Sequence, residues 1–140
     1  MKSIITFILS FAFSSIITAQ VKVPAAVEAA LKQNFPTVEK PLWDKENAHE
    51  YEAEFMLKGV KTSANFSDTG KWLETEMEIT ATALPKKVAD AFHAKYAGAE
   101  ITGAAKIETA DNKIKYEAEF KTNGKKQEVL FDADGNLLKQ

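Results

Sequence analysis

The chain has no cysteine and no arginine, and only two histidines among its 140 residues. Without cysteine there is no disulfide, no thiol nucleophile and no lipid-attachment thiol, so an exported form would depend on its core alone. Arginine is the side chain that binds phosphates and carboxylates through two parallel hydrogen bonds, so its absence disfavours a dedicated nucleotide or phosphate site. The net charge of −2 argues against nucleic acid, which requires a strongly basic face.

Long apolar runs are also absent, except for one at the N-terminus. Lys2 precedes an almost wholly apolar run from Ile4 to Ile17, and Ala19 offers a small residue at the expected cleavage point. This order is typical of a secretory signal peptide, and the run is shorter than the roughly 20 apolar residues that a membrane span needs. We expect residues 1–19 to be a signal peptide, and the mature protein to be periplasmic or secreted, with no membrane span after cleavage.

One short stretch of sequence is present twice. Tyr-Glu-Ala-Glu-Phe begins at Tyr51 and again at Tyr116, and each copy is followed by a glycine at the same distance. With the two copies in register, four of the six glycines form pairs. These pairs are Gly59 with Gly124 and Gly70 with Gly135. We interpret the pattern as an internal duplication, with residues 20–80 as a first repeat and residues 81–140 as a second.

Each predicted repeat begins with a helix. Pro24 and Pro85 are suited to a first helical turn, and apolar residues follow both at helical spacing. The apolar positions are Val27, Ala30, Leu31 and Phe35 in the first repeat, and Val88, Ala91, Phe92 and Tyr96 in the second. We expect each helix to pack on the strands of its own repeat.

Strand patterns follow each helix. In the first repeat, residues 38–43, 50–58 and 60–66 read as strands, with a fourth strand running to Ile79, and Asp44 to Ala48 reads as a polar turn. Tyr51, Ala53 and Phe55 are expected to face the helix. The sequence therefore predicts an α+β fold of two tandem modules, each one helix followed by a four-stranded antiparallel meander.

These runs resemble a known family. "VP" before the first helix and "YEAEF" with its following glycines, repeated as "LP" and "YEAEF", look like the PepSY-like family of exported bacterial proteins, which is described as similar to beta-lactamase inhibitor protein. The resemblance covers residues 20–140 and implies a tandem fold with a non-catalytic, inhibitor-like binding role, without naming a target. The second copy departs from the pattern, because Leu137 stands where the first copy has Trp72.

The candidate binding residues lie on the strands of the first repeat. By alternation, glutamates and two tryptophans are predicted to share the solvent-facing side of the sheet, and tryptophan is enriched at binding hot spots. The candidates are Trp43, Trp72, Glu52, Glu54, Glu74 and Glu76. They favour a protein partner in the cell envelope. Two alternatives stay open: the glutamates are an ordinary solvated surface while Trp72 covers the sheet edge or the module junction, or the acidic face binds a small ligand or a cation.

No catalytic residues, metal ligands or cofactor are predicted, and we expect the protein not to be an enzyme. Ser63 and Ser67, the two serines outside the leader, are not in a Gly-x-Ser-x-Gly pattern, and there is no cysteine nucleophile. The run from Asp132 to Asn136 is similar to the start of a calcium loop but lacks the later ligands, which favours a simple turn. His49 and His93 are too far apart in sequence to suggest a zinc site.

Overall fold

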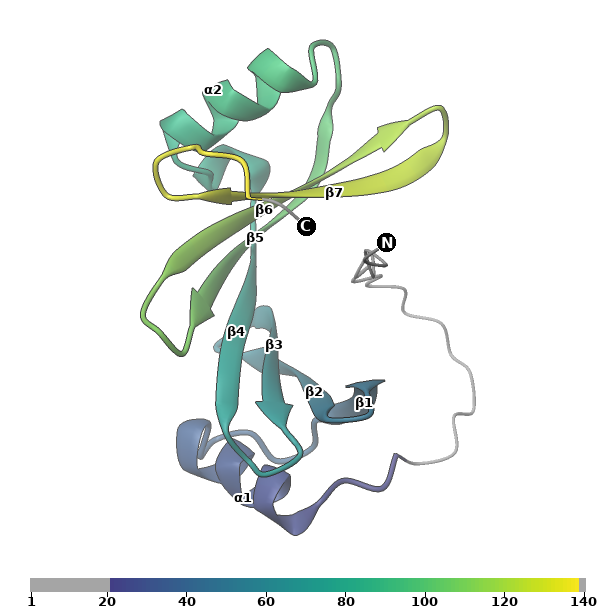
Figure 1. The fold of residues 1–140 in the computed structure, drawn as a ribbon, viewed down its shortest axis with the longest axis vertical. Coiled ribbons are helices and arrows are strands. Elements are labelled where there is room, and N and C mark those ends of the chain that lie inside the picture. Colours follow the sequence, from purple (N-terminus) through teal and green to yellow (C-terminus); the bar gives the residue numbers. More distant parts are fainter. Residues whose placement is uncertain (1–20, 139–140) are drawn as a thin grey trace, which may run out of the picture. The chain divides into compact units, whose positions relative to one another are not determined.

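The computed structural model describes residues 21–138, so the predicted signal peptide lies outside the described residues. The elements are α1 (Ala25–Asn34), β1 (Leu42–Asn47), β2 (Glu50–Leu57), β3 (Val60–Ser67), β4 (Trp72–Ile79), the short 3₁₀ helix η1 (Ala81–Ala83), α2 (Lys86–Lys95), β5 (Ile101–Thr109), β6 (Ile114–Thr122) and β7 (Lys125–Asp132) (Figure 1). None of the helices in this part of the chain is long and apolar enough to cross a membrane.

The prediction of two tandem modules, each with one helix and four strands, is wrong. The strands form one seven-stranded sheet in the order β1-β2-β3-β4-β5-β6-β7, with four strands after α1 and three after α2. Between β7 and Leu138, the last described residue, the chain makes an isolated bridge from Leu137 to Phe131. The residues there, Asn136-Leu137-Leu138, lack the alternating apolar pattern that makes Trp72–Ile79 a strand. Because β4 and β5 are neighbours, neither leaves an open edge of unpaired backbone groups.

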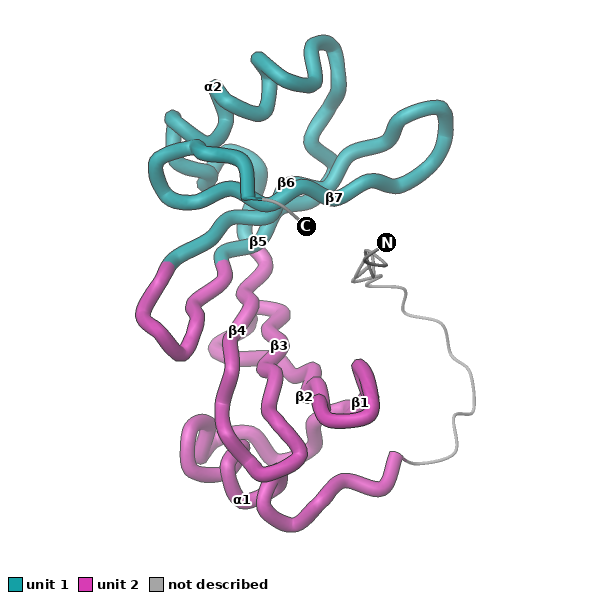
Figure 2. Tube along the Cα trace, in the orientation of Figure 1, with its two compact units in different colours: residues 1–17, 79–106, 114–140 teal, residues 18–78, 107–113 magenta. Residues whose placement is uncertain are grey.

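The chain divides into two compact units, shown in Figure 2. Unit 2 contains the described residues 21–78 together with residues 107–113, the tip of the β5–β6 hairpin. This tip is hydrogen-bonded to β4, since the Ala110 backbone N–H donates to the carbonyl oxygen of Leu73 at 2.7 Å. The buried core of unit 2 consists of Val27, Ala30, Leu31, Tyr51, Ala53, Phe55, Ala64 and Phe66. The apolar stripe of α1 therefore packs on β2 and β3, as expected.

Unit 1 contains residues 79–106 and 114–138 of the described chain. Its core joins the buried face of α2 to β5, β6 and β7. The members are Leu84, Val88, Phe92, Ala104, Ala118, Phe120, Val129 and Phe131. Three aromatic rings meet where the partly buried Tyr96 packs against this core, and Phe120 lies 5.2 Å from Phe92 and 4.5 Å from Tyr96, centroid to centroid. The expected contact between the second helix and its own strands is confirmed.

Two of the paired glycines are required by close approach of a helix. Gly70 has a φ of +83°, and a Cβ atom there would lie 2.5 Å from the carbonyl oxygen of Ala26 in α1. Gly135 has a φ of +85°, and a Cβ atom there would lie 2.6 Å from the carbonyl oxygen of Lys87 in α2. A residue with a side chain would be strained at both positions and would collide with the helix. The duplication itself remains a prediction from the sequence.

Candidate functional site

The strands β1 to β4 present two faces, which the strand register defines. Trp43, Ala53, Ala64 and Thr75 lie opposite one another across the four strands. Because Ala53 and Ala64 belong to the core beneath α1, this row marks the face covered by the helix. Residues one position along each strand point the other way, so the remaining face lies opposite α1.

We call this second face the acidic face. It comprises Leu42, Asp44, Glu46, Glu52, Glu54, Met56, Lys61, Ser63, Asn65, Glu74 and Glu76. Glu54 lies between Leu42 and Ser63, and Glu76 continues the same row on β4. The four predicted glutamates therefore do share one face of unit 2. Glu52 and Glu76 are nevertheless buried, so the face is not simply a solvated array of charges.

Both tryptophans lie on the helix side, and the prediction that they share the face of the glutamates is wrong. Trp43 and Trp72 pack against the core of unit 2, and the Trp72 indole N–H donates to the hydroxyl of Thr75 at 3.0 Å. In β4 the register shifts between the pairs Asn65–Glu74 and Phe66–Trp72, so one residue of β4 is extra. Such a bulge turns the residue before it to the opposite face. The six predicted residues therefore do not form one surface.

Glu52 is a strongly perturbed carboxyl group of the acidic face. Only 5% of its surface is exposed, and its pKa is raised from 4.5 to about 7, chiefly by burial. A hydrogen bond with the Glu46 carboxyl and the negative charges of Glu46 and Asp44 also contribute to this rise, whereas a hydrogen bond with Ser63 opposes it. Glu46 reaches Glu52 because a register shift between Lys45 and Asn47 makes it the extra residue of β1.

Two exposed apolar side chains on the acidic face were missed by the sequence analysis. Leu42 is 60% exposed and Met56 is 62% exposed, and both flank Glu54. Leu42 lies directly opposite Glu54, while Met56 is two residues further along β2, which makes the two apolar side chains diagonal neighbours. Alternation alone could have found Met56, because it falls on the same side of β2 as the glutamates.

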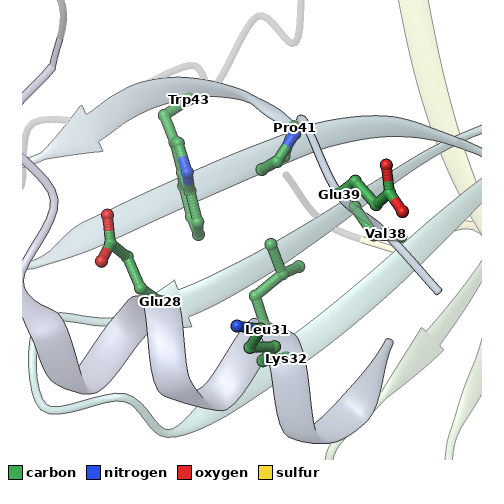
Figure 3. Close-up of a pocket in the computed structure, with 7 residues that line it drawn as sticks. All are labelled: Glu28, Leu31, Lys32, Val38, Glu39, Pro41 and Trp43. Carbon is green, nitrogen blue, oxygen red and sulfur yellow. The ribbon is translucent and has the colours of Figure 1, made fainter. Parts of the chain in front are cut away.

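A small pocket opens on the opposite side of β1. Its volume is about 180 Å³, and it lies between α1, β1 and the segment that connects them. The lining residues are Glu28, Leu31, Lys32, Val38, Glu39, Pro41 and Trp43. In Figure 3 the Trp43 ring projects from β1 toward the helix, and Leu31 projects from α1 toward the sheet. The tryptophan predicted as an anchor thus forms a wall of this pocket.

Unit 1 carries a second group of carboxylates. Oxygen atoms of Glu117, Glu119 and Glu128 lie within 4.8 Å of one another. Lys126 Nζ is 2.9 Å from Glu119 Oε1 and 3.5 Å from Glu128 Oε1, so an ammonium group already offsets part of this negative charge. The missing side chain of Gly103 leaves space for the Glu119 carboxylate, since a Cβ atom there would lie 2.8 Å from Glu119 Oε2. The arrangement is that of an ion-pair network.

The remaining polar candidates take part in turns. The Asp132 carboxylate accepts backbone N–H bonds from Asp134 and Asn136, both at 2.9 Å, which closes the turn after β7. His49 Nδ1 lies 2.9 Å from Asp68 Oδ2 at an exposed turn. The Ser67 hydroxyl lies 2.8 Å from that of Thr69. These contacts account for the Asp132 and Ser67 side chains locally, as the turn interpretation predicts.

Fold and surface together define a class of small α+β proteins with a helix-backed antiparallel sheet and a polar sheet face. The model of the PepSY-like family, described as "Putative beta-lactamase-inhibitor-like, PepSY-like", matches residues 49–139. The chain belongs to the PepSY-like family, and the resemblance inferred from the repeated runs is confirmed. The comparison with curated proteins gives no match.

Solved structures share this fold. A "putative periplasmic" protein from Bacteroides eggerthii is 21% identical, with a TM-score of 0.75 over 85% of this chain and 88% of that one. A DUF2874 family protein from Bacteroides uniformis is 24% identical, with a TM-score of 0.74 over 84% and 88%. A BLIP-like protein from Bacteroides fragilis is 24% identical, with a TM-score of 0.67 over 85% of both chains.

Proposed function

We propose that this protein is a non-enzymatic, exported binding protein that recognises a protein partner through the acidic face of β1–β4. The observation that carries the proposal is the pair of exposed apolar side chains, Leu42 and Met56, which are diagonal neighbours beside Glu54. Protein interfaces combine an apolar centre with polar groups around it, and methionine is enriched there. The acidic face offers this combination, with Glu74 at its polar margin.

The family description supports an inhibitor-like role within this proposal. Inhibitors of enzymes bind through preformed surfaces whose backbone moves little on association. A face built on four paired strands is preformed in this sense. A direct test is to mix the purified mature protein with a panel of purified β-lactamases and to follow hydrolysis of a chromogenic β-lactam. Loss of hydrolysis with rising protein concentration supports inhibition, and unchanged rates for every enzyme remove that role but not partner binding.

Partner binding is tested by photo-cross-linking in the periplasm. A photoreactive amino acid at Met56 lies on the acidic face, and one at Lys121 lies on an exposed position of β6 in the other unit. We expect one cross-linked protein from position 56 that is absent from position 121. Equal cross-linking from both positions would indicate unspecific collision and would contradict the proposal.

A cation-binding role is the second candidate, because the negative charges of Glu46 and Asp44 add to the cost of ionising the buried Glu52 carboxyl. A bound cation would relieve this cost and would stabilise the folded protein by mass action. Thermal melting in calcium or magnesium at millimolar concentration separates the two candidates. The protein-partner proposal expects an unchanged melting temperature, whereas a rise that disappears in Glu52→Gln would favour the cation.

A further inference from the structure

The pocket beside β1 has the size and composition of a site for one amphipathic side chain. Its volume of about 180 Å³ is below the roughly 300–1,000 Å³ of pockets that hold drug-sized ligands. Leu31, Val38 and Trp43 supply apolar lining, and the charged residues Glu28 and Glu39 line it from α1 and from the connecting segment. A side chain with an apolar stem and a polar head suits such a lining.

The charges of the lining favour a positively charged head group. Two carboxylates, on Glu28 and Glu39, stand against the single ammonium group of Lys32. Within residues 21–138 the side chains of Glu28 and Glu39 make no ion pair or hydrogen bond with other residues, so both carboxylates remain available to a ligand. The Trp43 ring adds a π face, which attracts Lys and Arg side chains.

We propose that this pocket receives a lysine or arginine side chain from an extended segment of the partner protein. Leu42 and Trp43 are consecutive on β1 and point to opposite faces, so one strand links the acidic face to the pocket. In the strand order β1 is an end strand that pairs only with β2 among the described strands, so a partner segment can reach both sides of it. The inference rests on the proposed function, since it takes the basic side chain to belong to the same partner.

The test is a titration that does not need the natural partner. The mature protein, labelled with ¹⁵N, is titrated with blocked tripeptides of the form acetyl-Ala-X-Ala-amide, where X is Arg, Lys, Leu or Glu. We expect the Arg and Lys peptides to shift the indole N–H signal of Trp43 in a saturable manner while the Trp72 signal stays in place. The Leu and Glu peptides should leave both signals unchanged.

Variants of the exposed lining residues test the charge argument. Glu28→Gln and Glu39→Gln should each weaken binding of the Arg peptide by about threefold, as expected for a partly exposed ion pair, and Lys32→Gln should strengthen it by a similar factor. All three side chains are exposed, so the fold should be kept, and the dispersion of the ¹⁵N spectrum verifies this. Glu78→Gln, an exposed carboxylate on β4, is the matched control.

Three results would overturn the inference. Equal shifts with the Leu peptide would show that charge is not recognised, and no shift with the Arg peptide at millimolar concentration would show that the pocket is closed to it. A free diamine that binds as tightly as the Lys peptide would identify a small-molecule site. None of these results affects the cross-linking from position 56, so the two proposals fail separately.

Discussion

At the scale of single residues, the chemistry of Glu52 departs clearly from that of a solvated glutamate. Its pKa of about 7, against 4.5 for an ordinary glutamate, follows first from burial and then from Glu46 and Asp44 nearby. Between these two pH values the folded chain keeps a proton that the unfolded chain has released. The stability that this group contributes is therefore fully present below pH 4.5, and it is lost as the pH rises through about 7.

We predict that Glu52→Gln changes the pH dependence of folding. The amide can still donate a hydrogen bond to Glu46 but cannot ionise, so the variant should gain stability relative to the natural protein between pH 4 and pH 8. A pKa raised from 4.5 to about 7 corresponds to a gain in the free energy of unfolding on the order of 3 kcal/mol. Urea denaturation at pH 4, 6 and 8 measures it, with Glu78→Gln as the control. A difference that is the same at all three pH values would refute the assigned cause.

Trp72 is a second residue whose role the structure revises. Its indole packs against the core of unit 2 and donates to Thr75, so Trp72→Ala should lower the free energy of unfolding by about 2–4 kcal/mol. Met56→Ala, on the exposed side of the same sheet, should stay within about 0.5 kcal/mol of the natural protein. Thermal or urea unfolding compares the two variants. A Trp72→Ala variant as stable as Met56→Ala would show that the indole lies outside the core.

At the scale of elements, the sequence predicts faces well where a strand keeps its register. On β2, which pairs continuously with β3, Tyr51, Ala53 and Phe55 are buried beneath α1 as alternation requires. On β4 the same reasoning fails at Trp72, because a bulge depends on the partner strand and leaves no mark in the local pattern.

The prediction of the first strand is wrong for a different reason. Residues 44–47, Asp-Lys-Glu-Asn, read as a polar turn, yet they belong to β1. Charged side chains are common on end strands, where they oppose unwanted pairing with other chains. Composition therefore cannot separate such a strand from a loop. The pocket could not be predicted either, since its lining comes from three segments that only the fold brings together.

Substitutions at two glycines can distinguish the energetic cost of backbone strain from the cost of a collision with a helix. Gly59 and Gly70 have similar φ values, +81° and +83°, but an added Cβ atom meets nothing within 4 Å at Gly59 and the Ala26 carbonyl oxygen at 2.5 Å at Gly70. Gly59→Ala should cost about 1–2 kcal/mol through strain alone. Gly70→Ala should cost clearly more, because α1 must also move. Equal losses in urea denaturation would mean that the close approach of α1 has no energetic consequence.

At the scale of the whole molecule, the described residues 21–138 form seven strands where the sequence predicts eight. The three strands after α2 continue the order of the four after α1, and the described part of the stretch that would be an eighth strand forms an isolated bridge to β7. The family resemblance identified the class of fold, but the number of strands depends on pairing between distant segments. This is why the repeat alone suggested two equal modules.

Export belongs to this scale as well, and it stays a prediction. We expect the full chain, expressed in a Gram-negative host, to be recovered from the periplasm with Gln20 as its first residue. Osmotic-shock fractionation followed by mass spectrometry of the intact protein measures both points. Recovery from the cytoplasm with residues 1–19 still attached would contradict the prediction.

Recognition of a protein partner through the acidic face is tested most directly by affinity. The partner cross-linked from position 56 is purified and titrated calorimetrically against the natural protein and against the double variant Leu42→Ser, Met56→Ser. Since a few apolar anchors carry most of the energy of an interface, we expect the double variant to bind at least about tenfold more weakly, with an unchanged melting temperature. An unchanged Kd would contradict the assignment of this face.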